Sequence, residues 1–273
     1  MDFIVGDIHG CFDEFMALRE KCQEHAGKNK IRMVSCGDLI DRGPKSFEVV
    51  EHFATHGEDI ALLGNHEQEF LVISHHFAPW NFDHVKKYPI WFHSLAESYK
   101  SGEFSVEFPT LEDYAQSHIV NWTMQGGSQT LKSFEVDPLD PTTWYFDKTL
   151  IDYMLSLPLY LEEDEYFLSH ALVTQHSFPH LKNGKIIDVE DIDHIFDIVD
   201  ELLWNRDQED LFIHPTKIMV SGHTPFQEGA NWMHEKKILQ VDTGCVYGGP
   251  LTAWSASDNT LLIQPSLQKS TAN

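Results

Sequence analysis

Three short segments in the first quarter of the chain combine glycine with carboxylate, imidazole or amide side chains. They are GDIHG at residues 6–10, GDLIDRG at 37–43 and GNHE at 64–67, and each follows an apolar run. An ordinary turn uses glycine and often aspartate, but it has no need of histidine. Carboxylate, imidazole and amide oxygen together suit Mn²⁺, Fe or Zn²⁺ better than Mg²⁺ or Ca²⁺. These residue types therefore predict a metal centre.

Two histidines further along the chain also end apolar runs. His170 ends YFLSH, and His223 ends MVSGH. Binding sites in parallel α/β sheets form just beyond the carboxyl ends of the strands, so all five segments can meet in one crevice. Two ions about 3.5–4 Å apart, bridged by a carboxylate, would use all of these donors. Such a pair would also concentrate positive charge for an anionic substrate.

The elements that must carry these segments alternate between strand and helix in the first third of the chain. We expect strands at residues 3–5, 31–35 and 59–63, and helices at 12–26, 46–53 and 67–75. Short connections in this order predict parallel strand pairing with right-handed crossovers. From residue 159 the pattern becomes strand-rich, interrupted by one helix at about 189–203.

Residues 77–157 differ from the rest of the chain because they are rich in aromatic side chains and broken by prolines. We expect a mostly helical insertion, which either elaborates the packing of the main domain or forms a wall of a substrate cleft. The sequence shows no internal repeat or linker. It therefore predicts a single domain over residues 1–265, followed by a polar tail at 266–273.

The composition is strongly acidic. Lys and Arg total 19 against 43 Asp and Glu, which gives a formal net charge of −24. This balance argues against a nucleic acid or an anionic membrane as partner. No apolar run reaches the length of a membrane span, and we expect no signal peptide before the first strand. We expect a monomer with reduced thiols in the cytoplasm, since no C-x-x-C pair occurs among Cys11, Cys22, Cys36 and Cys245.

The motifs resemble those of the metal-dependent phosphoprotein phosphatases, within the calcineurin-like metallophosphoesterases. The matching pieces are GDIHG, GDLIDRG, GNHE, FLSH at 167–170 and SGHT at 221–224, joined by LLWNRD at 202–207 and VDTGCVYGGPLTA at 241–253. The last two are similar to the bacterial serine/threonine phosphatases. The resemblance covers about residues 3–253, apart from most of the insertion. It implies an α/β fold, a β-sandwich of two mixed sheets flanked by helices, with a helical insertion.

The resemblance also implies two divalent metal ions, with Mn²⁺ expected and Fe or Zn²⁺ as alternatives. The implied ligands of the first ion are Asp7, His9 and the bridging Asp38, and those of the second are Asp38, Asn65, His170 and His223. One departure is visible, because Ala171 follows His170 where the family often has glycine. We therefore expect the approach to the second ion to be shaped differently.

The implied reaction is hydrolysis of phosphomonoesters by direct attack of a hydroxide that bridges the two ions, which lower the pKa of water from 15.7 toward ~7. Arg42 and Arg206 are expected to bind phosphoryl oxygens, because a guanidinium fork matches two oxygens at once. His66 is expected to protonate the leaving oxygen, while Asp41 holds its ring. Two further substrate contacts are expected in the cleft: Asn65 and Tyr247.

The expected substrate is a phosphoprotein bearing phosphoserine or phosphothreonine, or another small phosphoester. The alternative is a dinucleoside polyphosphate such as diadenosine tetraphosphate, which enzymes on the same scaffold hydrolyse symmetrically. Glu67, which follows the Asn-His pair, favours the protein phosphatases. An aromatic-rich insertion able to stack adenine favours the nucleotide enzymes.

Two other classes compete with this interpretation. Cys36 and Arg42 fit C-x₅-R, the pattern of tyrosine phosphatases with a cysteine nucleophile. Asp38 and Asp41 lie inside that loop, however, and would repel both a thiolate and a phosphate. The second competitor is a metal-bound scaffold that binds phosphorylated partners without cleaving them. A complete set of acid, bridging carboxylate and arginines argues against it.

Overall fold

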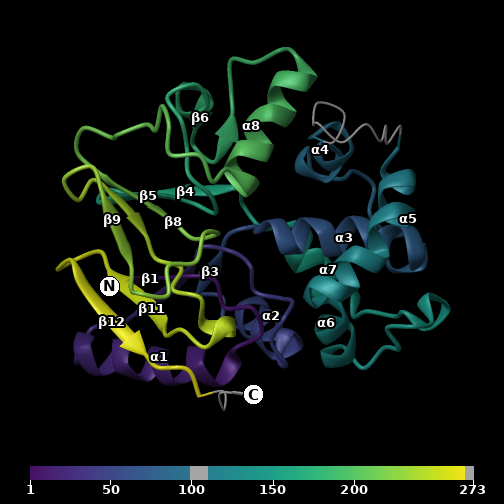
Figure 1. The fold of residues 1–273 in the computed structure, drawn as a ribbon, viewed down its shortest axis with the longest axis horizontal. Coiled ribbons are helices and arrows are strands. Elements are labelled where there is room, and N and C mark those ends of the chain that lie inside the picture. The colour runs from purple at the N-terminus through teal and green to yellow at the C-terminus, as the bar shows by residue number, and fades with distance from the viewer. Residues whose placement is uncertain (99–109, 268–273) are drawn as a thin grey trace.

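The protein, whose computed structural model describes residues 1–98 and 110–267, has two five-stranded sheets on one side and a group of helices on the other (Figure 1). The first sheet has the order β12–β11–β1–β2–β3, with β1 at Asp2–Val5, β2 at Arg32–Ser35, β3 at Ile60–Ala61, β11 at Leu251–Ser255 and β12 at Thr260–Gln264. The second has the order β4–β5–β8–β10–β9, with β4 at Tyr160–Glu162, β5 at Tyr166–Ser169, β8 at Ile218–Ser221, β9 at Asn231–Met233 and β10 at Ile238–Gln240.

Both sheets are mixed. In the first sheet β1, β2 and β3 run parallel, while β11 and β12 are antiparallel to their neighbours. In the second sheet β5, β8 and β10 run parallel, while β4 and β9 are antiparallel to theirs. The predicted fold of two mixed sheets with helices outside is confirmed.

The side chains of β1 alternate between two cores. Phe3 and Val5 share a cluster with apolar residues of α1 (Phe12–Ala26), whereas Ile4 packs between the sheets with Leu168 of β5. Because both faces are covered, the strand is apolar along its length. Full burial of each large aliphatic side chain contributes about 1.5–3 kcal/mol. These layers hold the carboxyl end of β1, and with it the GDIHG segment, in a fixed place.

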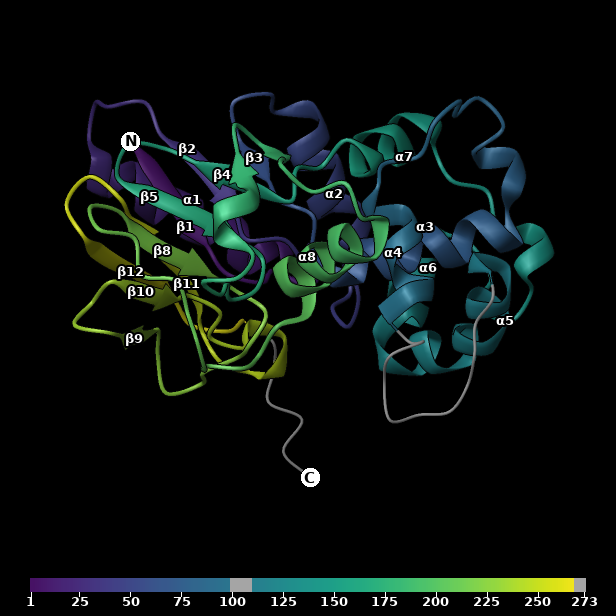
Figure 2. The ribbon, with the colours of Figure 1, turned by 90° about the horizontal axis from the view of Figure 1, so that it is seen from above.

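Helices cover the outer faces of the two sheets (Figures 1 and 2). Helix α1 packs against β11 and β12 of the first sheet. Helix α8 (Ile192–Trp204) covers the second sheet, where Ile198 and Leu202 share a core with Phe167 and Met219. A separate hairpin is formed by β6 (Leu181–Lys182) and β7 (Lys185–Ile186).

The helices that follow β2 and β3 carry two of the predicted site segments. Helix α2 spans Ser46–Thr55, and α3 spans Asn65–Phe77. Helix α3 begins two residues earlier than the predicted start at residue 67. The cause is the side chain of Glu67, which accepts a hydrogen bond from the backbone N–H of Gly64 at 3.0 Å and so completes the cap of the helix. Asn65 and His66 therefore lie in the first turn of α3.

Helices also dominate the described part of the predicted insertion. They are α4 (Trp91–Ser98), α5 (Leu111–Trp122), a π-helical turn (Thr123–Gly127), α6 (Ser128–Ser133) and α7 (Lys148–Leu155). Six of the aromatic rings here are buried, and they belong to the same large cluster as Phe3 and Val5 of β1: Phe82, Trp91, Phe92, Trp122, Trp144 and Phe146. These six rings therefore contribute to packing, as the first of the two expectations has it, while a wall of the substrate cleft formed by the insertion remains a prediction.

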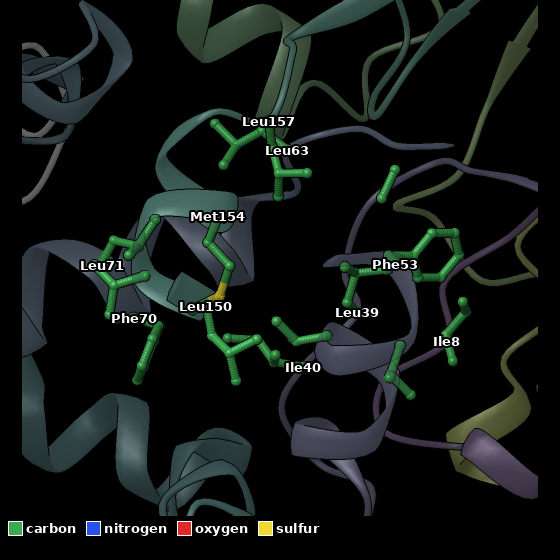
Figure 3. Close-up of a cluster of buried hydrophobic side chains, with 14 of the residues drawn as sticks. Ile8, Leu39, Ile40, Phe53, Leu63, Phe70, Leu71, Leu150, Met154 and Leu157 are labelled. Atoms are coloured by element: carbon green, nitrogen blue, oxygen red, sulfur yellow. The ribbon is translucent and has the colours of Figure 1, made fainter. Parts of the chain in front are cut away.

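The insertion packs against the loop that carries GDLIDRG. Figure 3 shows Leu150 and Met154 of α7 beside Ile40 of that loop, and all three belong to one buried cluster. The limits of the single domain and of the tail remain a prediction. Among residues 1–98 and 110–267, no helix is both long and apolar enough to cross a membrane.

Candidate active site

The two oxygens of Asp38 face two different groups of histidines. Oδ2 lies 3.5 Å from Nε2 of His9 and 4.0 Å from Nε2 of His66. Oδ1 lies 3.4 Å from Nε2 of His170, in a second group that His223 completes. Within each group the donor atoms lie within 4.8 Å of one another, and all five residues are buried. Asp38 is the shared member, as the prediction of a bridging ligand requires.

Asn65 places its amide oxygen between the two histidines of the second group. Its Oδ1 lies 2.9 Å from Nε2 of His170 and 3.0 Å from Nδ1 of His223. The neighbouring backbone N–H of His66 donates to Oδ1 of Asp38 at 3.1 Å. The first turn of α3 thus supplies an amide oxygen that can bind a metal ion. It also directs the positive end of the helix dipole at the candidate metal centre.

Asp7 and His9 leave β1 together but meet different partners. Nε2 of His9 faces Asp38, whereas the carboxylate of Asp7 accepts the backbone N–H of His223, 3.0 Å from Oδ1. His66, rather than Asp7, completes the group around His9 and Asp38. The structure brings Asp7 to the centre but places it outside both of these groups. Its role as a ligand remains a prediction.

Backbone carbonyls set the orientation of two of the histidine rings. Nδ1 of His9 lies 2.7 Å from the carbonyl oxygen of Ile40, and Nδ1 of His170 lies 2.9 Å from that of Cys36. A carbonyl only accepts hydrogen bonds, so in each ring Nδ1 donates and Nε2 presents its lone pair toward Asp38. Metal-binding histidines have this arrangement in proteins. The donor set therefore fits a pair of divalent ions.

The buried histidines divide into two kinds by their pKa. Burial disfavours the charged ring and lowers the pKa of three of them below the ordinary value: His9, His170 and His223. Neutral imidazole is the form that binds metals. Burial also acts to lower the pKa of His66, but Asp38 and Asp41 outweigh it, so the pKa of His66 is raised. Among these four rings, His66 is the one suited to carry a proton.

The predicted acid pair is brought together. Nδ1 of His66 lies 2.6 Å from Oδ2 of Asp41, and both side chains are buried. Asp41 lies in the loop after β2 with φ of 70°, a left-handed conformation that costs a non-glycine residue energy. Surrounding contacts must therefore hold it there.

Asp242 is a buried carboxylate of the centre that the sequence interpretation missed. Burial and the neighbouring carboxylates raise the pKa of Asp7 well above its usual range, and burial likewise raises that of Asp242 to about 6. Carboxylates crowded in this way call for cations nearby. A signal was present, because Asp242 lies two residues after the end of the buried strand β10, as Asp7 lies two residues after the end of β1.

Both predicted arginines reach the centre. A guanidinium nitrogen of Arg42 contacts Nε2 of His9, and its Cζ lies 5.5 Å from the ring centroid of Tyr247. Nε of Arg206 lies 3.1 Å from Nε2 of His223. Tyr247 is 53% exposed, so it lies at the open side of the centre rather than in the core.

Glu67 supports the loop of Asp38 and does not face outward. Its carboxylate accepts backbone N–H groups from Asp38, Leu39 and Ile40 at 2.8–3.1 Å, in addition to that of Gly64. A Cβ at Gly64 would lie 2.2 Å from Oδ1 of Asp38, so only glycine permits this close approach. Glu67 is a structural residue, and its identity carries little information about the substrate.

Cys36 is not suited to be the nucleophile that the competing cysteine mechanism requires. Cys36 is fully buried, and burial together with Asp7 and Asp242 raises the pKa of its thiol well above the ordinary value. A nucleophilic cysteine needs a lowered pKa and an accessible thiolate. The C-x₅-R spacing in this loop is therefore coincidental.

The fold has two mixed sheets, and two groups of nitrogen and oxygen donors share one carboxylate, that of Asp38. This is the arrangement of the metallophosphoesterase class. The family model described as calcineurin-like phosphoesterase matches residues 3–248. The chain therefore belongs to the calcineurin-like phosphoesterase family.

Curated relatives and a solved structure resemble the chain to different extents. The symmetrical bis(5'-nucleosyl)-tetraphosphatase of Psychromonas ingrahamii is 46% identical over 72 residues, which are 26% of this chain and only 25% of that protein. The enzyme of the same name from Marinomonas sp. is 24% identical over 96% of both chains. A protein serine/threonine phosphatase from Saccharomyces cerevisiae has the same fold, with a TM-score of 0.54 at 15% identity, over 99% of this chain and 81% of that one.

Proposed function

We propose that the protein is a hydrolase of phosphoric esters or anhydrides that depends on two divalent metal ions. The observation that carries this proposal is the position of Asp38, whose two oxygens face two separate groups of buried donors. A single carboxylate shared in this way is what a two-metal phosphoesterase needs. Fold and family membership agree with it.

The proposed ligands are four of the five buried donors of the two groups, without the acid His66, together with two neighbouring residues: Asp7, His9, Asp38, Asn65, His170 and His223. Ions bound there supply positive charge for the phosphoryl oxygens and an activated water at neutral pH. The imidazole and amide donors favour Mn²⁺, Fe or Zn²⁺.

The chain itself supplies the acid. His66 holds a proton at its ring because Asp38 and Asp41 raise its pKa. Nδ1 donates to Asp41, which leaves Nε2 to donate its proton to the leaving oxygen. General acid catalysis of this kind contributes roughly 10²–10⁴-fold.

Arg42 and Arg206 bind the phosphoryl oxygens in this proposal. The guanidinium group of Arg42 contacts His9 in the first donor group, and that of Arg206 contacts His223 in the second. Each group that shares Asp38 therefore has one arginine beside it. This local positive charge is needed because the chain as a whole carries −24. Tyr247, beside Arg42, is a proposed contact for the rest of the substrate.

We further propose that the substrate is a dinucleoside tetraphosphate, hydrolysed symmetrically. The support is the Marinomonas relative, which aligns over 96% of both chains and is named for that activity. The expectation of a phosphoprotein substrate depends in part on Glu67, which holds the loop of Asp38 rather than the substrate. The alternative expectation is therefore the better supported.

A substrate panel tests both levels of the proposal. The protein with Mn²⁺ is given diadenosine tetraphosphate and, separately, phosphoserine, phosphothreonine and phosphotyrosine peptides. Symmetrical hydrolysis consumes one water and yields two ADP, so we expect ADP as the nucleotide product and the highest kcat/KM for this substrate. ATP with AMP, or a preference for a peptide, would contradict the substrate. No hydrolysis of any phosphoester would contradict the enzyme class.

A further inference from the structure

Two side chains of the insertion bind the carboxylate of Asp41. Nε1 of Trp122 donates to Oδ2 at 2.8 Å, and Oγ1 of Thr130 donates to Oδ1 at 2.6 Å. Oδ2 also accepts the hydrogen bond from His66 at 2.6 Å. The carboxylate that holds His66 is therefore itself held by two further side chains, 81 and 89 positions away in sequence.

The insertion also binds the backbone of the same loop. The N–H of Asp41 donates to Oγ1 of Thr130 at 2.8 Å, and the N–H of Arg42 donates to the carbonyl oxygen of Gly126 at 3.1 Å. Asp41 and Arg42 have φ of 70° and 68°. Consecutive left-handed residues other than glycine persist only where surrounding contacts hold them. These hydrogen bonds from the insertion are such contacts.

Trp122 is rigidly placed for this task. It is 1% exposed, and its ring packs against Phe70 of α3 and Trp144 of the insertion. A Cβ at Gly127 would lie 2.3 Å from the indole, so the turn between α5 and α6 is shaped around the ring. A buried indole N–H needs an acceptor, and Asp41 provides it.

We propose that Trp122 and Thr130 are positioning residues, through which the helical insertion sets the orientation of Asp41 and, by way of Asp41, of the acid His66. This inference rests on the acid role in the proposed function. It assigns the insertion a part in catalysis, without contact between these two residues and the substrate. Hydrogen bonds to a charged group stabilise by more than those between neutral groups. Removing one of these hydrogen bonds to Asp41 should lower kcat about tenfold.

The test compares leaving groups. A general acid matters most when the leaving oxygen is a poor leaving group, so phenyl phosphate depends on His66 more than p-nitrophenyl phosphate does. For Trp122→Phe and Thr130→Val, we expect kcat for phenyl phosphate to fall about tenfold, with a smaller loss for p-nitrophenyl phosphate. KM and the content of bound Mn²⁺ should stay unchanged.

Matched variants separate positioning from general damage to the fold. Trp144→Phe makes the same change in the same aromatic core, but the indole of Trp144 donates to the carbonyl oxygen of Asp137 instead, so activity should be kept. Thr130→Ser keeps the hydroxyl and should rescue Thr130→Val. In a His66→Asn background, Trp122→Phe should have no further effect on kcat, because the two residues act through one step.

Three results would overturn the proposal. They are an equal loss for both leaving groups, a loss in Trp144→Phe as large as in Trp122→Phe, and additive losses with His66→Asn. A measurement without turnover covers the case in which the protein hydrolyses nothing. In protein loaded with Zn²⁺ and labelled with ¹⁵N at histidine, the Nδ1 proton of His66 should exchange slowly. It should exchange faster in Trp122→Phe and Thr130→Val, and unchanged exchange would contradict the proposal.

These outcomes distinguish the two proposals. If the protein cleaves aryl phosphates but not diadenosine tetraphosphate, the proposed substrate is wrong, while the positioning of His66 is still tested in full. If diadenosine tetraphosphate is cleaved but the variants behave as their controls do, the function stands and the inference about the insertion fails.

Discussion

Nδ1 of His66 lies 2.6 Å from Oδ2 of Asp41, although the two residues are 25 positions apart in sequence. Two of the other buried histidines, His9 and His170, direct the same ring nitrogen at a backbone carbonyl. A carboxylate stabilises an imidazolium, and a carbonyl does so less. This difference in partner distinguishes a ring that carries a proton from rings that can bind a cation.

Replacing His66 tests the acid role directly. We expect His66→Asn to lower kcat roughly 10²–10⁴-fold, because the leaving oxygen loses its proton donor. Metal content, measured by elemental analysis, should stay near that of the wild type. His170→Asn is the matched control and should lose bound metal. Loss of metal in His66→Asn would instead make His66 a ligand, which its place beside His9 and Asp38 makes a real alternative.

Replacing Asp38 tests the shared carboxylate. Asp38→Asn keeps the size of the side chain but removes the charge that faces both donor groups, so both ions should bind more weakly. Titration with Mn²⁺ should show affinity lowered at both sites, and activity should fall further than in His66→Asn. If one ion were lost and the other kept its affinity, the carboxylate would belong to one site alone.

Replacing Gly126 tests the contact between the insertion and Arg42. Gly126 has φ of 129°, and a Cβ there would lie 2.5 Å from the backbone nitrogen of Arg42. Gly126→Ala should raise KM by displacing Arg42 and should destabilise the fold by about 1–3 kcal/mol. Gly229→Ala is a matched control, because Gly229 has φ of 130° and open space around it. Backbone strain from the positive φ should lower the stability of both variants. If KM changed equally in both, the contact between Gly126 and Arg42 would have no role in substrate binding.

Stability in acid should depend on Asp59, away from the active site. Burial by itself raises the pKa of Asp59, but hydrogen bonds from His52 and from the backbone of Met33 outweigh it and hold the pKa below its ordinary value of 3.8. A lowered pKa means that the bonds stabilise the fold above pH 3.8, and that this stability is lost as the pH falls through the folded-state pKa. Asp59→Asn should therefore cost roughly 2 kcal/mol at pH 7.

Urea unfolding at several pH values checks this expectation. The gap between wild type and Asp59→Asn should narrow as the pH falls below 3.8, where the wild-type carboxyl also becomes neutral. The control is Asp83→Asn, which removes an exposed ion pair with Lys148 and should have a smaller effect. A gap that stays constant with pH would show that the effect is not due to the charge.

The strands that carry the centre could be predicted because their signals are local. Apolar runs at β1 and β2 end in Gly-Asp, and α1 begins and ends where its periodicity predicts. The predicted start of helix α3 is two residues late. The side chain of Glu67 caps the helix at Gly64 and also accepts the backbone N–H of Asp38, a contact with a distant part of the sequence. Glu67 was accordingly interpreted as a sign of the substrate rather than as a structural residue.

The role of the insertion could not be predicted in the same way. Trp122 and Thr130 stand in a segment without a motif, and their partner Asp41 lies more than 80 residues earlier. The strand end before Asp242 is a local signal, but the proximity of Asp242 to Asp7 is not, because the two carboxylates follow strands of different sheets. Pairs of this kind depend on how layers pack, which short-range patterns do not encode.

The sequence alone determined the kinds of donor present and the edge of the sheet at which they gather, because both follow from residues within a few positions of each other. Only the tertiary structure decided which oxygen of Asp38 faces which group, which ring holds a proton, and what supports Asp41. Those properties depend on burial and on hydrogen-bond partners, and both are set by contacts between segments far apart in the chain.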